Sequence, residues 1–440
     1  MNKKKLLEKM LRFMARGVLR KYRPLVIGIT GSVGKSLTKE AVALVVSQTY
    51  VTRKAEGNYN NEIGVPLTII GVSSGGGSFL CWAAIFCKWL WMMLYRERYP
   101  EVLVLEMGID RPGDMDYLLS FVSVQIGVVT GVSASHLMFF GSVGNIAKEK
   151  GKLVASLPED GFAILNADDK RAEKMREKAS AKTITYGFGT EAGLRVDNLL
   201  FHREAKRVEG FSFKLNYNGK TIPVRLPKLV ARHHIAAALA GAGVAVALKM
   251  NLVEIAEALE NFEPLPGRLR LLLGKEGIIL LDDTYNASPV SVVAALDVVK
   301  ELVAPRKVVI LGDMLELGAD AKPEHAALAP AVIDAGTHIV VLVGEYMRAL
   351  LDALRIAGFS RKQMFWFPDP MTALQNLKDI IREEDLILIK GSQSMRMEKI
   401  TRALLADPSV TKALLCRQSD EWQNRPFVPP AEWTDGEQGR

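Results

Sequence analysis

The fold is decided by residues 28–36, which read GITGSVGKS. An apolar run at Leu25–Ile29 leads into this stretch and predicts a buried β-strand, and the pattern over Ser36–Gln48 predicts a helix directly after it. A glycine-rich turn between a strand and a helix lets backbone N–H groups converge on phosphate oxygens. We therefore predict a phosphate-binding loop (P-loop) at this position.

Two side chains of the loop have the chemistry that phosphate binding needs. Lys35 is expected to neutralise terminal phosphate charge, and the Ser36 hydroxyl is expected to ligate Mg²⁺. The spacing departs from the strict G-x4-GK-[ST] pattern by one residue, because Ile29 stands where the first glycine is expected. A glycine turn unrelated to phosphate is the alternative interpretation.

Predicted strands and helices alternate along the rest of the chain. Further strands are expected at Val102–Glu106 and Ile126–Thr130, with helical stretches between them. This alternation predicts an α/β fold with a mostly parallel sheet covered by helices. A second α/β set follows Pro266-Gly267, with strands expected at Ile278–Leu281, Val308–Leu311, Ile339–Val343 and Leu386–Ile389.

The same patterns predict the domain organisation. In chain order we expect a basic helix at 1–23, a central P-loop domain at 24–263, a C-terminal Rossmann-like α/β domain at 264–416 and a loose polar tail at 417–440. The central domain is expected to contain an apolar helical insertion at 74–99. It is also expected to contain a small antiparallel excursion at 183–230, with segments at Thr183–Tyr186, Gly210–Leu215 and Thr221–Leu226.

Composition narrows the class of protein. Of the 440 residues 49% are hydrophobic and 24% are charged, which is typical of a globular chain with a core. The net charge of +8 is concentrated in residues 1–23, which hold nine Lys or Arg and one acid. Nucleic-acid binders usually carry their basic surface on the binding domain, so we expect no nucleic-acid partner. Three cysteines form neither a metal-ligand pattern nor a disulfide framework, which favours a cytoplasmic protein.

Two predicted helices raise the question of membrane contact. Residues 3–20 are amphipathic, and either lie on an anionic membrane or pack their apolar stripe on the next domain. Phe79–Tyr95 has Lys88 as its one polar residue and is shorter than the ~20 residues that span a bilayer. It is either a buried or partly exposed crossover helix or a membrane-facing or oligomer-forming one. Peripheral contact with the inner face of the membrane through 1–20 and 79–95 is therefore one open interpretation, and the sequence does not set the oligomeric state.

Other polar side chains follow the central strands. Glu106 ends a buried strand, where a carboxylate points into the crevice in which parallel sheets bind ligands, and it suits Mg²⁺. His136 comes after the next strand, and a later helix carries Lys148 and Lys150. A lone histidine is more often structural than a ligand, and spacing alone indicates solvated lysines.

The order of motifs along the chain resembles the Mur ligase family. In the first half the matching motifs are TGSVGKS (30–36), NYNNEIGVP (58–66), EMG (106–108), His136 with FGS (140–142), and LNADD (165–169). In the second half they are PGR (266–268), DDTYNASP (282–289), GDMLELG (312–318) and KGS (390–392). The resemblance covers about residues 25–402. It is strongest to the branch of the family that adds D-alanyl-D-alanine.

The resemblance implies an ATP-dependent, ADP-forming amide ligase of peptidoglycan precursor synthesis. A peptide carboxylate would be activated by ATP as an acyl phosphate, and an amino acid or a dipeptide such as D-alanyl-D-alanine would displace the phosphate. The expected partners are thus small-molecule and peptide substrates. The alternatives are a ligase of the same fold with another acceptor, of folylpolyglutamate or cyanophycin type, and a non-catalytic nucleotide-binding scaffold.

The resemblance also implies site residues. The catalytic residues are expected to be Lys35, His136 and Lys150. Two Mg²⁺ ions are expected on Ser36, Glu106, His136 and Lys150, the last as a carbamylated, carboxylate-like ligand. ATP is expected to contact Thr30, Gly31, Ser32, Gly34, Lys35, Ser36, His233, Arg268, Asp283 and Asn286. Substrate is expected to contact Asn60, Asn61, Asp313, Lys390, Ser392 and Arg396. For Asp313 and Lys390 a structural loop role is the alternative, and for Arg396 a surface cap.

Three features depart from the family pattern. The usual N-terminal uridine-nucleotide-binding domain has no counterpart before residue 25, so the donor is expected to be held differently or to carry no uridine diphosphate. The family's His-Asn-x-x-Asn is replaced by HHIAA at 233–237, which removes both asparagines from the adenine contacts. The apolar insertion at 79–95 has no counterpart in a typical member.

Overall fold

The structure is a computed structural model that describes residues 3–57, 59–133, 137–204 and 207–424. The chain forms two compact units. Unit 1 comprises residues 1–202, 211–227 and 232–262, and unit 2 comprises residues 203–210, 228–231 and 263–440. Across the described ranges, no helix has the length and apolar character needed to cross a membrane.

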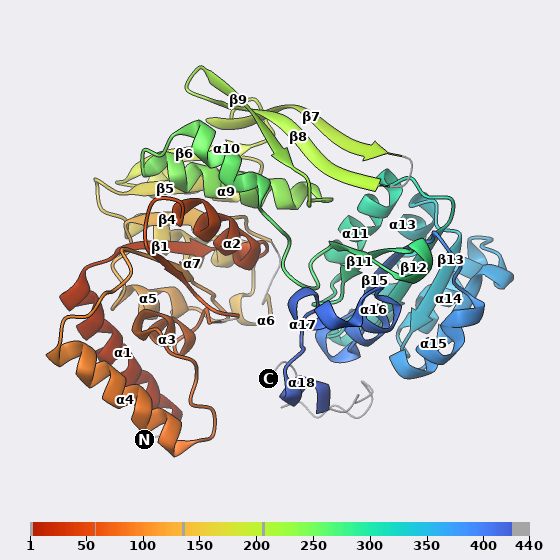
Figure 1. Cartoon of the computed structure of the whole chain (residues 1–440), viewed down its shortest axis with the longest axis horizontal. Helices are drawn as coiled ribbons and strands as arrows, with labels where there is room; N and C mark the ends of the chain where they lie inside the picture. Colours follow the sequence, from red (N-terminus) through yellow and green to blue (C-terminus); the bar gives the residue numbers. More distant parts are fainter. Residues whose placement is uncertain (1–2, 58, 134–136, 205–206, 425–440) are drawn as a thin grey trace. The chain divides into compact units, whose positions relative to one another are not determined.

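The first sheet has nine strands in the order β2-β3-β1-β4-β5-β6-β7-β8-β9 (Figure 1). The strands are β1 (Leu25–Thr30), β2 (Thr52–Lys54), β3 (Val102–Glu106), β4 (Ile126–Val129), β5 (Phe162–Asn166), β6 (Lys182–Gly187), β7 (Leu194–Glu204), β8 (Arg207–Tyr217) and β9 (Lys220–Leu226). Neighbouring strands from β2 to β7 are parallel. The predicted mostly parallel α/β sheet is confirmed.

Helices cover this sheet on its two faces. They are α1 (Lys3–Tyr22), α2 (Lys35–Val46), α3 (Gly64–Ile70), α4 (Phe79–Leu94), α5 (Asp114–Leu119), α6 (Leu137–Phe140), α7 (Val143–Ala155), α8 (Lys170–Glu173), α9 (Arg232–Ala247) and α10 (Leu252–Glu260). Alternate residues of β3, Leu103 and Leu105, share a buried core with α1, α3, α4, α5 and α7. Helices α2 and α9 pack against each other and against the strands.

The amphipathic N-terminal helix packs on its own unit. Leu11, Met14 and Val18 of α1 are fully buried in the core shared with α3 and α4. Since these residues form the apolar stripe of the helix, the packing interpretation of residues 3–20 is confirmed for the stripe itself. The basic residues remain on the opposite side of α1.

The prediction for 183–230 was partly wrong. β6 covers the segment Thr183–Tyr186, and it pairs in parallel with β5 as a member of the main sheet. β8 and β9, by contrast, are antiparallel partners, as predicted. The error arose because Thr183–Tyr186 alternates exposed or half-buried threonines with the buried Ile184 and Tyr186, a pattern more typical of antiparallel strands.

Unit 2 contains a six-stranded sheet in the order β10-β11-β15-β12-β13-β14, in which β10 is the antiparallel member. The strands are β10 (Arg270–Leu273), β11 (Ile279–Asp283), β12 (Lys307–Gly312), β13 (Ile339–Val343), β14 (Met364–Phe367) and β15 (Leu386–Lys390). The α-helices are α11 (Pro289–Glu301), α12 (Ala321–Ala326), α13 (Ala329–Asp334), α14 (Met347–Ile356), α15 (Pro370–Asn376), α16 (Glu398–Leu404), α17 (Thr411–Leu414) and α18 (Asp420–Asn424). Because β15 lies between β11 and β12, the loops that follow these three strands meet at one edge.

Candidate active site

The predicted phosphate loop joins β1 to α2 at the centre of the first sheet. β1 lies between β3 and β4, so the connections leave in opposite directions from the ends of these strands, which is the edge where parallel sheets bind ligands. Gly31 packs so closely on the β4 strand end that a Cβ at this position would lie 1.9 Å from Thr130 Oγ1. Gly34 has φ 81°, and among the described residues no side chain caps the start of α2. The N–H groups of this helix start are thus available to an anion.

Two lysines converge on one carbonyl of the loop. Lys35 Nζ donates to Gly31 O at 2.8 Å, and Lys150 Nζ donates to the same oxygen at 2.9 Å. Burial, with a smaller contribution from the positive charge of Lys35, lowers the pKa of Lys150 to about 7. Lys35 therefore places a positive charge at the loop, and Lys150 shares its acceptor with a pKa close to neutrality.

A carboxylate oxygen lies buried at the end of β3. Ile29 and Glu106 are register partners, so Glu106 ends its strand beside the loop. Its Oε1 accepts a hydrogen bond from Asn60 Nδ2 at 3.1 Å, whereas its buried Oε2 accepts none from the described part of the chain. Thr30 Oγ1, also buried, donates to Met107 O at 2.9 Å and ties the loop to β3.

The donor set at this edge fits Mg²⁺. A buried carboxylate oxygen without a hydrogen-bond donor is a hard ligand that a divalent cation can use. Within the described ranges no three His, Cys, Asp or Glu side chains cluster as a metal site. This is compatible with Mg²⁺, which usually takes one or two protein ligands and completes its shell with phosphates and water. His136, predicted as a metal ligand, lies outside the described residues.

Three residues that were not predicted as site residues hold the loop in place. Thr130 Oγ1 donates to Val33 O at 2.5 Å, and Asn166 Nδ2 donates to Thr130 O at 2.9 Å. Asp169 Oδ2 accepts from Val132 N at 2.7 Å. The signal that could have found them is their position at or just beyond the ends of β4 and β5, next to the loop. Ser32 belongs to the same network, since its hydroxyl donates to Ser133 O at 3.1 Å.

Two further predicted contacts of unit 1 have local roles. Asn61 Oδ1 accepts from the backbone N–H groups of Ile63 and Gly64 at 3.2 and 2.9 Å, so it fixes the start of α3. His233 is exposed at the start of α9, with its ring 4.5 Å from the ring of His234. The assignment of Asn61 to substrate and of His233 to ATP stays a prediction.

In unit 2 a buried ion pair links β11 to β15. Lys390 Nζ donates to Asp283 Oδ2 at 2.6 Å and to Asn286 O at 2.9 Å. Burial lowers the pKa of Lys390, although the charge of Asp283 acts in the opposite direction. Asp283 Oδ1 accepts from Leu269 N at 3.2 Å, which fixes the segment that carries Arg268. The Arg268 guanidinium stacks 4.0 Å from the centre of the Tyr285 ring.

Asp313 is buried below the start of α14. Its Oδ1 accepts from Met347 N at 2.9 Å, and its Oδ2 has no hydrogen-bond partner in the described chain. Burial raises the pKa of Asp313 to about 7. His325 Nε2 is 4.0 Å away but accepts from Met314 N, and burial lowers the His325 pKa, so this ring is neutral. Asp313 therefore has no cationic partner in His325.

Ser392 and Arg396 follow β15. Ser392 Oγ accepts from Leu315 N at 2.8 Å and joins the loops after β12 and β15. Arg396 is buried, and its Nε donates to Glu398 Oε1 at 2.7 Å, while Arg417 holds the other oxygen of Glu398 at 2.8 Å. The expected surface cap at Arg396 is thus a buried ion pair, and its role toward substrate stays a prediction.

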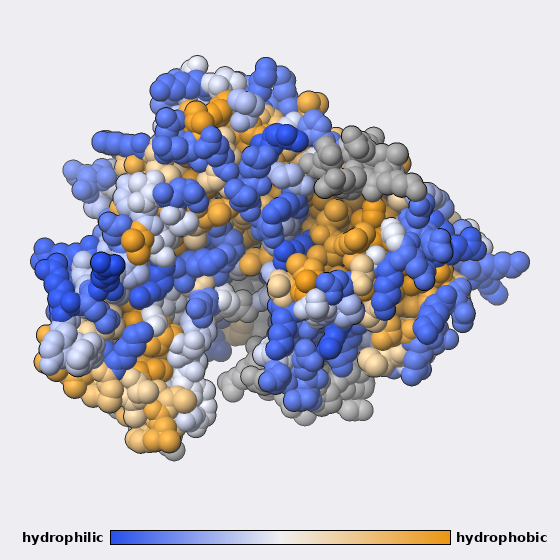
Figure 2. Space-filling model, viewed as in Figure 1, coloured by the Kyte–Doolittle hydropathy of each residue, from blue (hydrophilic) through white to orange (hydrophobic). Residues whose placement is uncertain are grey.

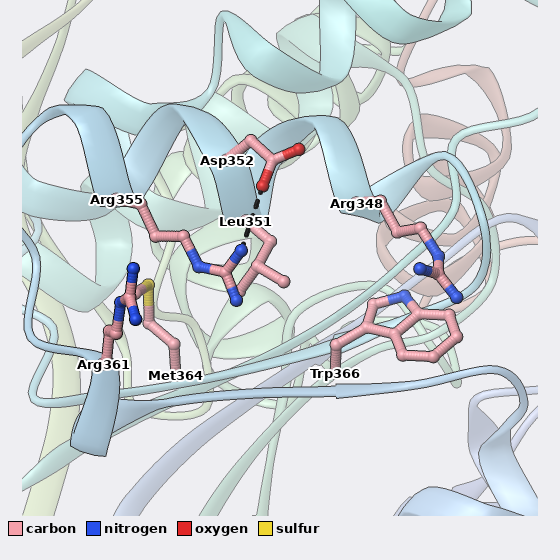
Figure 3. A pocket seen from close by; sticks show the side chains of 7 residues that line it. All are labelled: Arg348, Leu351, Asp352, Arg355, Arg361, Met364 and Trp366. Carbon is pink, nitrogen blue, oxygen red and sulfur yellow. Dashed lines mark hydrogen bonds and ion pairs between the residues drawn. The ribbon is translucent and has the colours of Figure 1, made fainter.

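Unit 2 also has a cavity of about 330 Å³ between α14 and β14 (Figure 3). Figure 3 shows the Arg348 guanidinium over the Trp366 ring and Arg355 bonded to Asp352. The residues that line it are Arg348, Leu351, Asp352, Arg355, Arg361, Met364 and Trp366. None of these is a predicted site residue, so the cavity is separate from the residues assigned above.

Comparison with family models places two known domains on this chain. Residues 90–245 match the Mur ligase middle domain, and residues 267–393 match the Mur ligase glutamate ligase domain. The UDP-N-acetylmuramoyl-tripeptide–D-alanyl-D-alanine ligase of Escherichia coli is 32% identical over 381 residues, covering 86% of this chain and 76% of that protein.

Solved structures agree in fold. MurF from Acinetobacter baumannii superposes with a TM-score of 0.75 at 26% identity, over 91% of this chain and 80% of that one. MurF ligase from Thermotoga maritima, solved in complex with ADP, superposes with a TM-score of 0.70 at 22% identity, over 90% and 82% of the two chains. The second likeness concerns the fold alone.

Proposed function

The chain belongs to the Mur ligase family, and from this premise we propose that it joins D-alanyl-D-alanine to a muramyl tripeptide carboxylate. Enzymes of this class are ATP-dependent, ADP-forming acid–amino-acid ligases. In the proposed reaction a donor carboxylate oxygen attacks the γ-phosphorus of ATP, and ADP leaves. The amine nitrogen of the dipeptide then attacks the acyl carbon, inorganic phosphate leaves, and the nitrogen loses a proton.

The observation that carries the proposal is the convergence of Lys35 and Lys150 on Gly31 O, beside the buried oxygen of Glu106. The first step brings two anions together, a carboxylate and a triphosphate. Fixed positive charge at the loop lowers that repulsion and stabilises the charge on the transferring phosphoryl group. We assign this role to Lys35, with the loop backbone from Thr30 to Ser36 orienting the phosphates.

Mg²⁺ would be held by Glu106 and the Ser36 hydroxyl, with His136 and Lys150 as the proposed ligands of a second ion. When bound, the metal neutralises phosphate charge and orients the γ-phosphate. Asn60 donates to Glu106 Oε1, so Oε2 is the oxygen that would be available to a cation. We propose that Asn60 is a positioning residue for this carboxylate.

We propose that Lys150 reacts with CO₂ to form a carbamate. Only a neutral amine attacks CO₂, and a pKa of about 7 gives that form a large population at neutral pH. The neutral nitrogen bonds to the carbon of CO₂ and loses one proton, so a neutral amine becomes an anionic carbamate. The product would exchange repulsion from Lys35 for attraction, and it would offer oxygen ligands to a metal.

In unit 2 we propose that Arg268, Asp283 and Asn286 serve the nucleotide, and that Asp313, Lys390, Ser392 and Arg396 hold the loops that position the amine. The support is structural order: Lys390 ties Asp283 to Asn286, and Ser392 ties the loops after β12 and β15. Since the reaction consumes ATP, we propose that it takes place in the cytoplasm.

The test is ADP release by the purified full chain with Mg-ATP, D-alanyl-D-alanine and muramyl tripeptides with or without the uridine nucleotide. We expect ADP and an amide product of matching amount, identified by mass spectrometry, only when donor and dipeptide are both present. ADP release that does not depend on either substrate would contradict the proposal. So would the absence of ADP release with every donor while the protein still binds ATP.

A further inference from the structure

Helix α4 is apolar apart from Lys88, yet it is buried along only one narrow stripe. Of its 16 residues only Ile85 and Met92 are buried. Its exposed apolar residues are Phe79, Leu80, Phe86, Leu90, Trp91 and Leu94, and Tyr95 follows the helix end. Figure 2 shows this surface as an orange region at the lower left, over α4. A helix with such composition normally finds an apolar environment on its free side.

This helix is held firmly in its exposed position by α1. Lys21 Nζ donates to three carbonyls at the end of α4, those of Met92, Met93 and Tyr95, at 2.8, 3.0 and 2.8 Å. Trp89 Nε1 donates to Met14 O at 3.0 Å. A cation on the last carbonyls of a helix satisfies groups that have no partner within it. The exposed side is therefore built into the fold of unit 1.

Basic side chains lie on α1, which packs against α4, and in the segment directly after α4. On α1 the exposed residues Lys5, Lys9, Arg16 and Arg20 lie off the buried stripe, and Phe13 is exposed between them. Arg96 and Arg98 are exposed just beyond α4. The acids in these segments are Glu8, which is half-buried and lies 3.9 Å from Lys4, and Glu97, which is exposed between Arg96 and Arg98. An apolar helix with aromatic residues and a cationic border matches the chemistry of an anionic bilayer surface.

We propose that α1 and α4 together form a peripheral membrane-docking surface that binds anionic phospholipid. In this arrangement α4 lies in the plane of the interface, with Phe79, Leu80, Trp91 and Leu94 among the upper acyl chains. At 1.5 Å per residue its 16 residues are about 24 Å long, less than the ~30 Å hydrocarbon core, so it lies on the bilayer and does not cross it. The cationic side chains of α1 contact the phosphate groups of the lipids.

Charge argues against a second copy of this chain as the occupant. An isologous contact between two α4 surfaces would bring two cationic α1 helices together and desolvate them. An anionic lipid surface instead neutralises the same residues. The proposal does not depend on the ligase reaction, since it rests on side chains outside the candidate active site.

The experiment is co-sedimentation of the full chain with vesicles of phosphatidylcholine alone or of equal phosphatidylcholine and phosphatidylglycerol. We expect binding to the anionic vesicles that weakens as salt is raised, and little binding to the neutral ones. Trp91→Ser with Leu94→Ser should remove the apolar contact. Lys9→Gln with Arg20→Gln should weaken binding about 25-fold, at roughly a fivefold loss for each cation.

Matched controls exist in unit 2. Ile356→Ser with Val303→Ser removes two exposed apolar side chains, and Lys378→Gln with Lys412→Gln removes two exposed cations. Both should bind vesicles like the unsubstituted chain. An unchanged thermal midpoint would show that the α4 double variant is folded. The proposal is overturned if this folded variant still binds anionic vesicles as the wild type does. It is equally overturned if the wild type does not bind vesicles and instead forms a dimer that is dissociated by Trp91→Ser with Leu94→Ser.

Discussion

Lys35 and Lys150 share one hydrogen-bond acceptor, the carbonyl oxygen of Gly31, at 2.8 and 2.9 Å. Two ammonium groups held this close repel each other, which contributes to the lowered pKa of Lys150. The repulsion between the two ammonium groups is reduced when an anion binds in the loop, or when Lys150 is converted to an anion. Both relief routes belong to the proposed chemistry, and each can be tested.

Lys35→Ala should abolish the fixed charge that meets the phosphates. We expect kcat for ADP release to fall about 10²–10³-fold, the usual cost of one preorganised charge or donor in a transition state. The control is Lys148→Ala, which removes an exposed lysine of α7 and should leave kcat unchanged. Equal kcat in Lys35→Ala and wild type would exclude the assigned role.

Removal of dissolved CO₂ should inactivate the enzyme, and bicarbonate should restore it. At constant dissolved CO₂ the activity should fall as the pH drops below about 7, because protonation withdraws the reactive amine of Lys150. ¹³C NMR of protein equilibrated with labelled CO₂ should show a carbamate signal that Lys150→Met lacks and Lys148→Met retains. A signal unchanged in Lys150→Met would place the carbamate elsewhere.

Gly31→Ala should distort the phosphate loop. Its Cβ would lie 1.9 Å from Thr130 Oγ1, so β4 and the loop must move apart. We expect ATP affinity, measured by calorimetry, to weaken at least about tenfold. Gly57→Ala is the control: it also has a positive φ, 49°, but its Cβ would meet no atom within 4 Å among the described residues. If both variants bind ATP alike, the loop geometry does not govern affinity.

Lys390→Met should destabilise unit 2 strongly. It leaves the buried carboxylate of Asp283 without its cation, and such losses cost about 3–5 kcal/mol in the free energy of unfolding. The matched surface pair, Lys300 with Asp334 at 2.7 Å, is solvent-screened, so Lys300→Met should cost far less stability. Urea titrations of both variants decide the matter, and equal costs would contradict the buried pairing.

Asp313 should make stability depend on pH. Its folded pKa of about 7 lies above the ordinary value of 3.8, so the folded state holds its proton more tightly. The resulting stabilisation is complete below pH 3.8 and is lost as the pH rises through 7. Asp313→Asn lacks this dependence. The stability of the variant relative to wild type, measured as the difference between their free energies of unfolding, should therefore be greater at pH 8 than at pH 5. A difference that is constant with pH would show that Asp313 is ionised throughout.

Much of this architecture was accessible from the sequence because its signals are local. Apolar runs and glycines indicate three elements: the loop at 28–36, the strand ending in Glu106 and the helix at 79–95. The structure places all three as predicted. The Mur ligase motifs supplied the family. Short polar edge strands such as Thr52–Lys54 carry no periodic signal and were not predicted.

What could not be predicted depends on contacts between distant residues. The burial of Arg396 follows from Glu398 being held simultaneously by Arg417, a partner 21 residues from Arg396 that no local pattern indicates. The alternation in Thr183–Tyr186 is shared by parallel and antiparallel strands, and only pairing with β5 distinguishes them. The sharing of Gly31 O by Lys35 and Lys150 likewise needs three dimensions.

The most direct test of the central claim follows the oxygen of the donor. A muramyl tripeptide labelled with ¹⁸O in its reacting carboxylate is incubated with the enzyme, Mg-ATP and D-alanyl-D-alanine, and the released phosphate is analysed by mass spectrometry. Acyl-phosphate formation predicts one ¹⁸O transferred to inorganic phosphate for each amide bond made. Amide product accompanied by unlabelled phosphate, or by label in AMP, would contradict it.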